Sequence, residues 1–574
     1  MNFKNFRAVV AIDFGTTYSG FAYANQNNPD ITVNDSWPGR LRTRLTMPKT
    51  NTVLQYDTTS KDPKNWTVNC WGFPALAQEP TRKSRRQSSE TNNTLPVELF
   101  KLHLADNLRN FEKPYLPIDY EKAISDYLSH MKPLIEEVLE KRWPGIKFTQ
   151  VRFVFTVPAE WRPHTIGILQ ECIHKAGFTE KKQSNNNLEF ITEPEAAAIY
   201  TMGKLEEHKV KAGSSFMVVD CGGGTVDLTT RTLLPDNKLS EITERTGDLC
   251  GSTYVDREFI RFLEKKLGFA AVDEFRRENY GQYQYLIHHF FCPRIKFEFI
   301  GESNDSRSID LDIERTCPAL MKHVTDEIKD AMEEEDWLIE IKYDDVLAMF
   351  EPVVEKILNL IRDQLASSKQ KCSAMFLVGG FSESPYLVKK VKGAFTSVVP
   401  IITVPQNPIT AVLRGAVMYG LDKAAVATRV LTMNYGVRVY PLWRAGVDPK
   451  KRKTSDGRIY KFSCLATRGR EVTPDEPCSG TYYPIYPDQN TILFSVFATP
   501  RKNSRFCDEE GMRKIGELEI EIPDIEGGTD RPVEFSLMFG ELLITANARN
   551  KNSRKIYTAK FAYAKDSSYF EVTE

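Results

Sequence analysis

The segment FMVVDCGGGTVDLTT, residues 216–230, constrains the fold of this chain more than any other stretch. It begins as an apolar run typical of a buried strand and continues into three consecutive glycines between Asp220 and Asp227. Glycine is disfavoured in strands because it loses much backbone freedom on folding and packs no side chain. Three in a row indicate a turn whose bare N–H groups can face an anion, with carboxylates beside it that suit a metal ion.

A second segment, VVAIDFGTTYSG at residues 9–20, has the same order of features: an apolar strand, then Asp13, Gly15, Thr16 and Thr17. Consecutive N–H groups in a glycine turn form an anion-binding nest, and threonine hydroxyls add further donors. Because the two units lie about 200 residues apart, we expect duplicated halves, each with a phosphate-binding turn. Carboxylates at the strand ends can hold Mg²⁺, usually through the water molecules that this ion retains.

A third glycine pair, Gly379 and Gly380 in AMFLVGGFSES, follows another apolar run and precedes a helical pattern. It leaves room for a ligand to approach the backbone. Other glycine motifs fit poorly. The chain has no GxxxxGK[ST] sequence, and Asp227 stands where a dinucleotide-binding fingerprint requires a small residue.

Composition narrows the class of protein further. A chain of 574 residues is expected to form more than one domain, and its net charge of -1 gives no global field for nucleic acid or a membrane. The ten cysteines include no CxxC pair, which argues against zinc ribbons and disulfide frameworks. The N-terminus lacks a signal-peptide pattern, and no apolar run approaches the ~20 residues of a membrane helix. We therefore expect a cytoplasmic or nuclear protein, with solvated loops at the basic segment 81–93 and the polar segment 181–187.

Residues 8 to about 423 alternate between strand and helix patterns, which predicts an α/β domain. Strands are expected at 8–12, 151–157, 215–220 and 374–378. A helix is expected over 352–366, with Pro352 in its first turn and the apolar side chains on one face, namely Val353, Val354, Ile357, Leu358, Ile361 and Leu365.

From about residue 424 the pattern changes to period two. GELEIEI, residues 516–522, alternates charged and apolar side chains, and VEFSLMFGELLITANA alternates around a turn at Gly540. This stretch predicts a β-sandwich. We expect a domain at 1–423, with a second lobe starting near residue 213, and a β-sandwich domain at 424–574.

Five motifs in order, AIDFGTTYSG, ITEPEAAAIY, VVDCGGGTVDL, LVGGFSESP and NPITAVLRGA, resemble the successive signatures of the 70-kDa heat-shock protein family. They are similar, more loosely, to the wider actin and sugar-kinase ATPase superfamily. FKLHL resembles the family's lysine segment, and the β-rich tail is similar to its peptide-binding sandwich. The resemblance covers nearly the whole chain. It implies a two-lobed actin-like ATPase domain with duplicated RNase H-like halves, followed by a β-sandwich.

The resemblance also implies roles for single residues. Asp13, Asp220 and Asp227 would surround Mg²⁺ and its waters, Glu193 would lie near the attacking water, and Lys101 would reach the γ-phosphate of ATP. The remaining contacts to ATP or ADP would come from Gly15, Thr16, Thr17, Tyr18, Gly222, Gly223, Gly224, Thr225, Gly251, Lys296, Gly379 and Gly380. Pro158 resembles a hinge proline that reports the nucleotide state.

Other readings of these residues stay open from the residues alone. Glu193 could end a strand, and Lys101 could be a surface lysine. The adjacent histidines His288 and His289 are expected to pack rather than bind metal, and Cys221 and Cys250 are expected to be small buried fillers.

The sequence departs from the family pattern at the expected adenine pocket. Lys296 fits, but Pro293 and Phe297 stand where a glutamate and an arginine are expected, and Glu383 replaces an arginine that stacks on the base. Losing these contacts should weaken nucleotide binding by ~1–3 kcal/mol, part of which stacking on Phe297 could restore. The leucine-rich acidic linker, the helical lid and the acidic tail motif of the family have no counterpart here, so we expect a divergent, lidless member.

The leading functional prediction is an ATP-binding, slowly ATP-hydrolysing chaperone-like protein whose nucleotide state controls the binding of an extended peptide or client protein. The alternative is a nucleotide-sensing scaffold with negligible turnover, and a small-molecule kinase of the same superfamily fits less well. ATP or ADP and Mg²⁺ are the expected cofactors. Neither nucleic acid nor a membrane is expected as a partner, and no co-chaperone is indicated.

Overall fold

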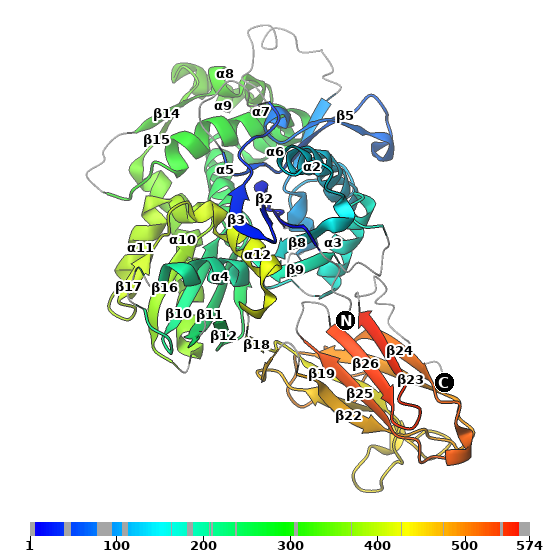
Figure 1. The fold of residues 1–574 in the computed structure, drawn as a ribbon. Helices are drawn as coiled ribbons and strands as arrows, with labels where there is room; N and C mark the ends of the chain where they lie inside the picture. Colours follow the sequence, from blue (N-terminus) through cyan, green and yellow to red (C-terminus); the bar gives the residue numbers. More distant parts are fainter. Residues whose placement is uncertain are drawn as a thin grey trace. The chain divides into compact units, whose positions relative to one another are not determined.

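The computed structural model shows a mixed α/β protein (Figure 1). It describes residues 6–39, 47–76, 94–105, 113–161, 163–180, 187–205, 207, 210–235, 238–302, 308–368, 370–425, 427–473, 476–539 and 544–561. Contacts between Cα atoms group the chain into two compact units. Unit 1 comprises 1–161, 169–229 and 246–423, and unit 2 comprises 162–168, 230–245 and 424–574.

Two sheets with the same strand order organise the first four hundred residues. One runs β3 (Asn28–Val33), β2 (Tyr18–Asn25), β1 (Ala8–Asp13), β8 (Val151–Val157), β9 (Leu188–Thr192). The other runs β12 (Lys238–Glu241), β11 (Val226–Leu234), β10 (Ser215–Cys221), β16 (Cys372–Val378), β17 (Ile401–Thr403). In both sheets the strand that carries the first aspartate pairs in parallel with the strand that follows it in the sheet order, β1 with β8 and β10 with β16. The four strands expected from the apolar runs are confirmed.

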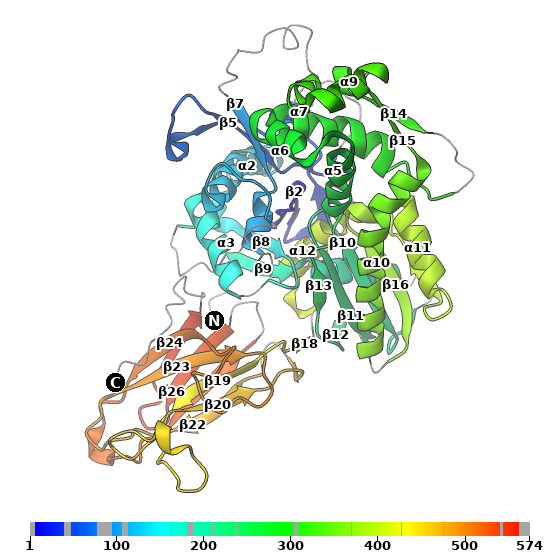
Figure 2. The same cartoon turned by 180° about the vertical axis from the view of Figure 1, so that it is seen from behind.

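Helices cover these sheets. α12 (Ala411–Leu421) packs on α4 (Glu193–Leu205) and against β1 and β8. α10 (Tyr343–Ser367) packs against α5 (Thr253–Leu267), and Figure 2 shows α10 alongside the sheet of β10 and β16. The core of this region joins side chains from one face of β10 and β16 to α5 and α10.

The helix expected over 352–366 begins nine residues earlier, so the prediction of its start was wrong. α10 starts at Tyr343, where the Asp345 side chain accepts a hydrogen bond from the N–H of Lys342 at 2.9 Å. Pro352 therefore lies in the helix interior, where it removes one backbone bond. The predicted apolar face is confirmed, because Val353, Ile357 and Ile361 are buried in the core and their neighbours on this face pack with them. That packing outweighs the missing bond.

Unit 2 contains two four-stranded antiparallel sheets. One runs β20 (Lys461–Ala466), β19 (Asn434–Val439), β23 (Thr491–Thr499), β24 (Arg513–Glu521), and the other runs β22 (Cys478–Tyr482), β25 (Val533–Met538), β26 (Ile544–Asn550), β27 (Ile556–Phe561). Their apolar faces share one buried cluster, in which the rings of Phe494 and Phe535 stack at 4.5 Å. Leu518, Ile520 and Ile522 are buried, as the period-two pattern predicts.

The other elements complete the chain. Among the described residues they include α2 (Tyr120–Arg142), α3 (Pro163–Lys175), α6 (Phe269–Glu278), α7 (Tyr280–Tyr285), a π-helix (Leu286–Lys296), α8 (Ile313–Thr316), α9 (Asp326–Glu334), α11 (Pro385–Phe395), β4 (Thr50–Asn51), β5 (Val53–Asp57), β6 (Thr67–Trp71), β7 (Thr94–Glu98), β13 (Thr246–Asp248), β14 (Ile309–Asp312), β15 (Leu338–Ile341), β18 (Arg429–Val430) and β21 (Glu471–Val472).

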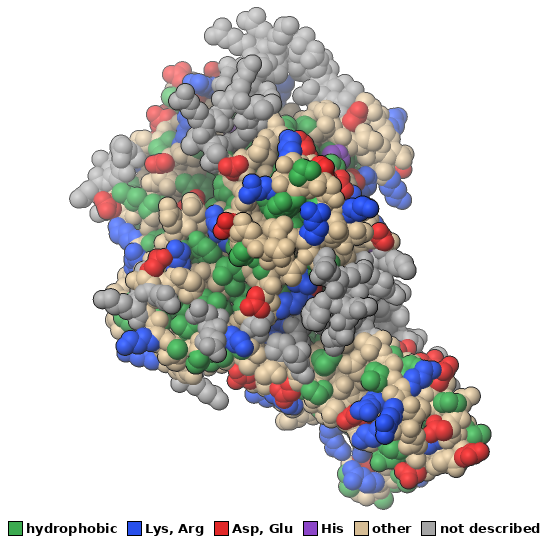
Figure 3. Space-filling model, in the orientation of Figure 1, with side chains coloured by type: hydrophobic (Ala, Val, Ile, Leu, Met, Phe, Trp, Pro, Cys, Tyr) green, Lys and Arg blue, Asp and Glu red, His purple; other side chains and the backbone are tan. Residues whose placement is uncertain are grey.

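Charge is distributed evenly over the visible surface. On the face drawn in Figure 3, basic and acidic side chains are interspersed. In the described part of the chain, every helix is too short or too polar to span a lipid bilayer. All ten cysteines lie within the described residues, and none forms a disulfide.

Candidate functional site

The two glycine–threonine turns predicted from the sequence face each other in the fold. A Cβ added to Gly223 would lie 2.3 Å from Oγ1 of Thr17, and one added to Gly224 would lie 2.5 Å from Oγ1 of Thr16. Both distances are far inside van der Waals contact. The backbone of the second turn therefore approaches the hydroxyls of the first as closely as only glycine allows.

The second turn is anchored through its carbonyl groups. The N–H of Thr253 donates to the carbonyl of Gly223 at 2.9 Å, and the N–H of Gly251 donates to the carbonyl of Gly224 at 3.2 Å. Among the described residues, no hydrogen bond is assigned to the N–H of Gly223 or Gly224. The anchor at the start of α5 thus holds the turn in one shape and leaves these two donors available.

The first turn is held differently. The N–H of Gly15 donates to Oγ of Ser19 at 3.1 Å, and Oγ1 of Thr52 donates to the carbonyl of Gly15 at 2.9 Å. The N–H of Gly15 is therefore occupied, and the side chains of Thr16 and Thr17 are the groups of this turn that face the second one.

The third glycine pair also reaches the site. Gly379 has a φ of 82°, a left-handed conformation, and a Cβ there would lie 2.4 Å from Oδ1 of Asp220. Any other residue would be strained and would collide with the carboxylate. Gly380 differs, because its nearest neighbour would be Cδ1 of Ile409 at 3.8 Å, which is ordinary contact.

The predicted carboxylates are buried together. Burial, followed by the charges of Glu193 and Asp227, raises the pKa of Asp220 well above its usual range. Burial and the charge of Glu193 raise the pKa of Asp227 to about 7. Such shifts arise when several carboxylates share one water-poor region, and they mark a site that gains from a cation.

Glu193 and Lys101 form a buried pair. Nζ of Lys101 donates to Oε1 of Glu193 at 2.7 Å and lies over the ring of Trp161 at 5.3 Å. Burial nevertheless raises the pKa of Glu193, because desolvation outweighs the attraction of the lysine. Lys101 is buried, so the alternative that it is a surface lysine is wrong.

Glu160 lies in the same region and was missed by sequence reasoning. Burial and the charges of Asp227 and Asp248 raise its pKa to about 9, and among described groups neither carboxylate oxygen has a hydrogen-bond partner. Its neighbour Ala159 donates its N–H to Oδ1 of Asp227 at 2.7 Å. The only sequence signal was its position two residues after Pro158.

Asp13 has two partners. Oγ1 of Thr156 donates to its Oδ1 at 3.2 Å, and Nζ of Lys49 donates to its Oδ2 at 2.5 Å. Lys49 was not predicted as a site residue, because no motif surrounds it and a lysine after a proline reads as a solvated loop residue.

Near the expected adenine pocket, Lys296 is buried and paired with Asp256 of α5 at 2.8 Å. The pKa of Tyr18 is raised by burial and by Cys292, with Lys296 acting in the opposite direction, so these side chains lie close together. Pro293 is exposed on the π-helix. Phe297 lies within 5.5 Å of Nζ of Lys296.

The carboxylates of the candidate site are chemically suited to a cation, but they are not arranged to coordinate one directly. In the described chain, no three His, Cys, Asp or Glu side chains are placed to hold a metal ion together. The raised pKa values of Asp220 and Asp227 are still the signature of carboxylates that gain from a positive charge. The residues therefore fit Mg²⁺ held through water, the arrangement this ion prefers.

His288, expected to pack, has a specific partner. Its Nε2 lies 2.9 Å from Oε2 of Glu98, whose Oε1 accepts a hydrogen bond from the hydroxyl of Tyr280. This buried group ties the π-helix to β7, three residues before Lys101. Cys221 and Cys250 are fully buried, which confirms their reading as core fillers.

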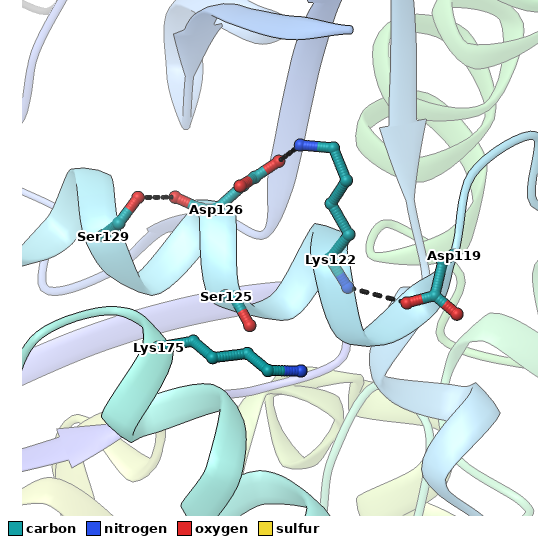
Figure 4. A pocket seen from close by; sticks show the side chains of 6 residues that line it. All are labelled: Asp119, Lys122, Ser125, Asp126, Ser129 and Lys175. Atoms are coloured by element: carbon teal, nitrogen blue, oxygen red, sulfur yellow. Dashed lines mark hydrogen bonds and ion pairs between the residues drawn. The ribbon is translucent and has the colours of Figure 1, made fainter. Parts of the chain in front are cut away.

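A cavity of about 340 Å³ lies between α2 and α3 and contains none of the predicted site residues (Figure 4). Its polar groups serve the helices: Asp119 accepts from the N–H of Lys122, and Asp126 pairs with Nζ of Lys122 at 2.7 Å. We do not assign a function to it. The basic loop at 81–93 and all but the last residue of the polar loop at 181–187 lie outside the described residues.

Comparison with known proteins supports the sequence resemblance. No protein-family model matches the chain. It is 26% identical over 627 residues to heat shock 70 kDa protein 12A of Mus musculus, an alignment that covers 95% of this chain and 90% of the relative. The human protein of the same name is 26% identical over 626 residues. Human heat shock 70 kDa protein 12B is 23% identical over 654 residues, covering 97% of this chain and 91% of the relative.

Proposed function

We propose that this chain is a divergent member of the 70-kDa heat-shock protein family, and that it binds ATP and ADP and uses nucleotide state to control the binding of an extended polypeptide. The observation that carries the proposal is the contact of two turns from distant parts of the chain, Thr16 and Thr17 against Gly223 and Gly224. Hydroxyls on one side and free backbone donors on the other suit a chain of phosphates.

In this proposal each group has one task. The N–H groups of Gly223 and Gly224 and the hydroxyls of Thr16 and Thr17 bind the β- and γ-phosphates. Asp13, Asp220 and Asp227 hold Mg²⁺ through water, and the ion supplies positive charge to the phosphates. Phosphoryl transfer to water needs positioning and charge neutralisation more than covalent catalysis, and fixed polar groups in a buried site supply both.

Glu193 orients the attacking water, and its buried partner Lys101 places a positive charge near the transferred phosphate. The 2.7 Å ion pair restrains both side chains. Turnover is therefore proposed to be slow, because binding of the phosphate has to compete with Glu193 for Lys101.

The β-rich residues 424–574 are proposed to form a β-sandwich that binds the client, and residues 1–423 to form the two-lobed ATPase domain. The repeated order of the two sheets supports two lobes. The single apolar cluster shared by the two four-stranded sheets supports the sandwich.

Calorimetric titration of the full chain with ATP and ADP, with and without Mg²⁺, tests nucleotide binding. We expect Asp220→Asn to weaken the binding of Mn²⁺, a probe of the Mg²⁺ site that electron paramagnetic resonance follows, whereas Asp126→Asn, which alters a carboxylate on α2 outside the site, should not. Failure of the wild-type chain to bind either nucleotide at millimolar concentration would refute the proposal. Equal Mn²⁺ binding by Asp220→Asn and the wild-type chain would refute the metal assignment alone.

A scaffold that senses nucleotide without hydrolysing it is the second candidate. The restraint of Glu193 by Lys101, and the carboxylate of Glu383 where the family has a base-stacking arginine, favour it. Release of phosphate from ATP decides between the two candidates: binding without phosphate release would favour the scaffold. Fluorescence anisotropy of a labelled unfolded polypeptide with the full chain, in ATP and in ADP, tests client binding, and an absence of binding in both states would remove that part.

A further inference from the structure

Lys49 is a buried cation among the carboxylates of the candidate site. Its side chain is only 10% exposed, and its Nζ lies 2.5 Å from Oδ2 of Asp13. It immediately precedes β4, which pairs with β2 and so connects it to the first phosphate turn. Its position is therefore set by the sheet and does not depend on a surface loop.

The same ammonium group acts on three further carboxylates. Its charge lowers the pKa of Glu193, Asp220 and Glu383, although burial raises each of them more strongly. One lysine thus pairs with Asp13 and also acts electrostatically on acidic side chains from three other segments of unit 1.

The absence of a side chain at Gly20 leaves space for Lys49. A Cβ added to Gly20 would lie 2.8 Å from Cγ of Lys49 and 2.8 Å from the carbonyl oxygen of Pro48. Gly20 is the residue of β2 that pairs with Asp13, so a side chain there would push the lysine away from the carboxylate. The lysine, the aspartate and the glycine form one packed unit.

We propose that Lys49 is a built-in cation of the nucleotide site, which neutralises Asp13 and binds the phosphates of the nucleotide, so that nucleotide binding depends only weakly on Mg²⁺. The inference rests on the proposed nucleotide binding and deepens it. A lysine is attached to the chain, so a chelator cannot remove it. It also supplies its charge without the reluctant dehydration of Mg²⁺. Its three donors allow it to bind a phosphate oxygen while it keeps its bond to Asp13.

The first test uses the unmodified chain. The affinity for ADP and ATP is measured by calorimetry in Mg²⁺ and in an excess of EDTA. We expect the dissociation constants to differ by less than about tenfold, which is less than the loss of one hydrogen bond to a charged group would cause. Binding that requires Mg²⁺ would overturn the role of Lys49 and leave the proposed function intact. A lack of binding under both conditions would refute both.

The second test removes the charge. Lys49→Met keeps the length of the side chain, and we expect it to weaken ADP binding in EDTA by about tenfold to a hundredfold, with Mg²⁺ restoring much of the loss. Lys49→Arg should retain binding in EDTA. Lys423→Met is the control, because it removes another partly buried lysine, which pairs with Glu189. It should leave the ratio of the ADP dissociation constants in EDTA and in Mg²⁺ unchanged. An unchanged ratio in Lys49→Met would overturn the proposal.

A measurement without nucleotide distinguishes the loss of the lysine charge from a loss of folding. Electron paramagnetic resonance follows the binding of Mn²⁺ to the free chain. Because Lys49→Met leaves the carboxylates uncompensated, it should bind Mn²⁺ more tightly than the wild-type chain. Weaker or equal binding by a variant with an unchanged circular dichroism spectrum would contradict a competition between lysine and metal. If Lys49→Met does not fold, the wild-type measurement in EDTA and the Lys49→Arg variant still decide.

Discussion

Replacement of Gly223 by alanine tests whether the two phosphate turns act as one site. The new Cβ would lie 2.3 Å from Oγ1, 3.0 Å from Cγ2 and 3.2 Å from Cβ of Thr17. Rotation of the threonine side chain cannot remove the crowding, because Cβ of Thr17 stays at 3.2 Å from the new Cβ in every rotamer. The two turns must therefore move apart, at the cost of about 1–3 kcal/mol that overpacking usually carries.

That cost appears in nucleotide affinity if the phosphates bind both turns at once. We expect ADP to bind Gly223→Ala about tenfold to a hundredfold more weakly than the wild-type chain, as measured by calorimetry. Gly393→Ala is the control, because Gly393 lies in α11, outside the predicted site, and an added Cβ there would have no atom within 4 Å. It should bind ADP normally. Equal affinities of Gly223→Ala and the wild-type chain, or an equal loss in both variants, would refute the reasoning.

Three further predictions concern catalysis, pH and stability. Glu193→Gln keeps the shape of the side chain and removes its charge, so phosphate release should fall by roughly 10²-fold or more while ADP affinity changes less than about threefold; a turnover that is retained would remove Glu193 from catalysis. Glu98, with help from Asp256, raises the pKa of buried His288 in spite of desolvation and of repulsion by Lys296. The stability from this histidine is thus fully present below about pH 6.5 and is lost as the pH rises through the folded pKa, by at most about 1.4 kcal/mol per pH unit. His288→Gln should flatten the pH dependence of denaturant unfolding above pH 6.5, and an unchanged slope would contradict the pairing. Phe535→Ala removes a fully buried ring that stacks on Phe494, and it should destabilise the β-rich unit by about 3–5 kcal/mol while ADP binding stays normal; a loss below 1 kcal/mol would contradict the core packing.

Local patterns in the sequence predicted the parts of the fold that depend on neighbouring residues. The strands that carry Asp13 and Asp220, the glycine turns after them, and the alternation at Leu518 and Ile520 were all visible. Strand and turn preferences act over a few residues, so a short window contains the information. The start of α10 was misplaced because Pro352 was taken as a residue of the first helical turn. In the structure it lies in the helix interior, where side-chain packing compensates for the missing backbone bond.

The site itself depended on the tertiary structure. Lys49 and Asp13 are 36 residues apart, and Lys101 and Glu193 are 92 residues apart, so no local pattern could join them. The raised pKa of Glu160, which lies in the turn after β8, likewise comes from burial and from the charge of Asp227 on β11. A sequence by itself determines which backbone shapes and residue types are present. Only the packed fold decides which charges lose water together and which of them share a partner, because desolvation and Coulomb attraction depend on distance in space and not on distance along the chain.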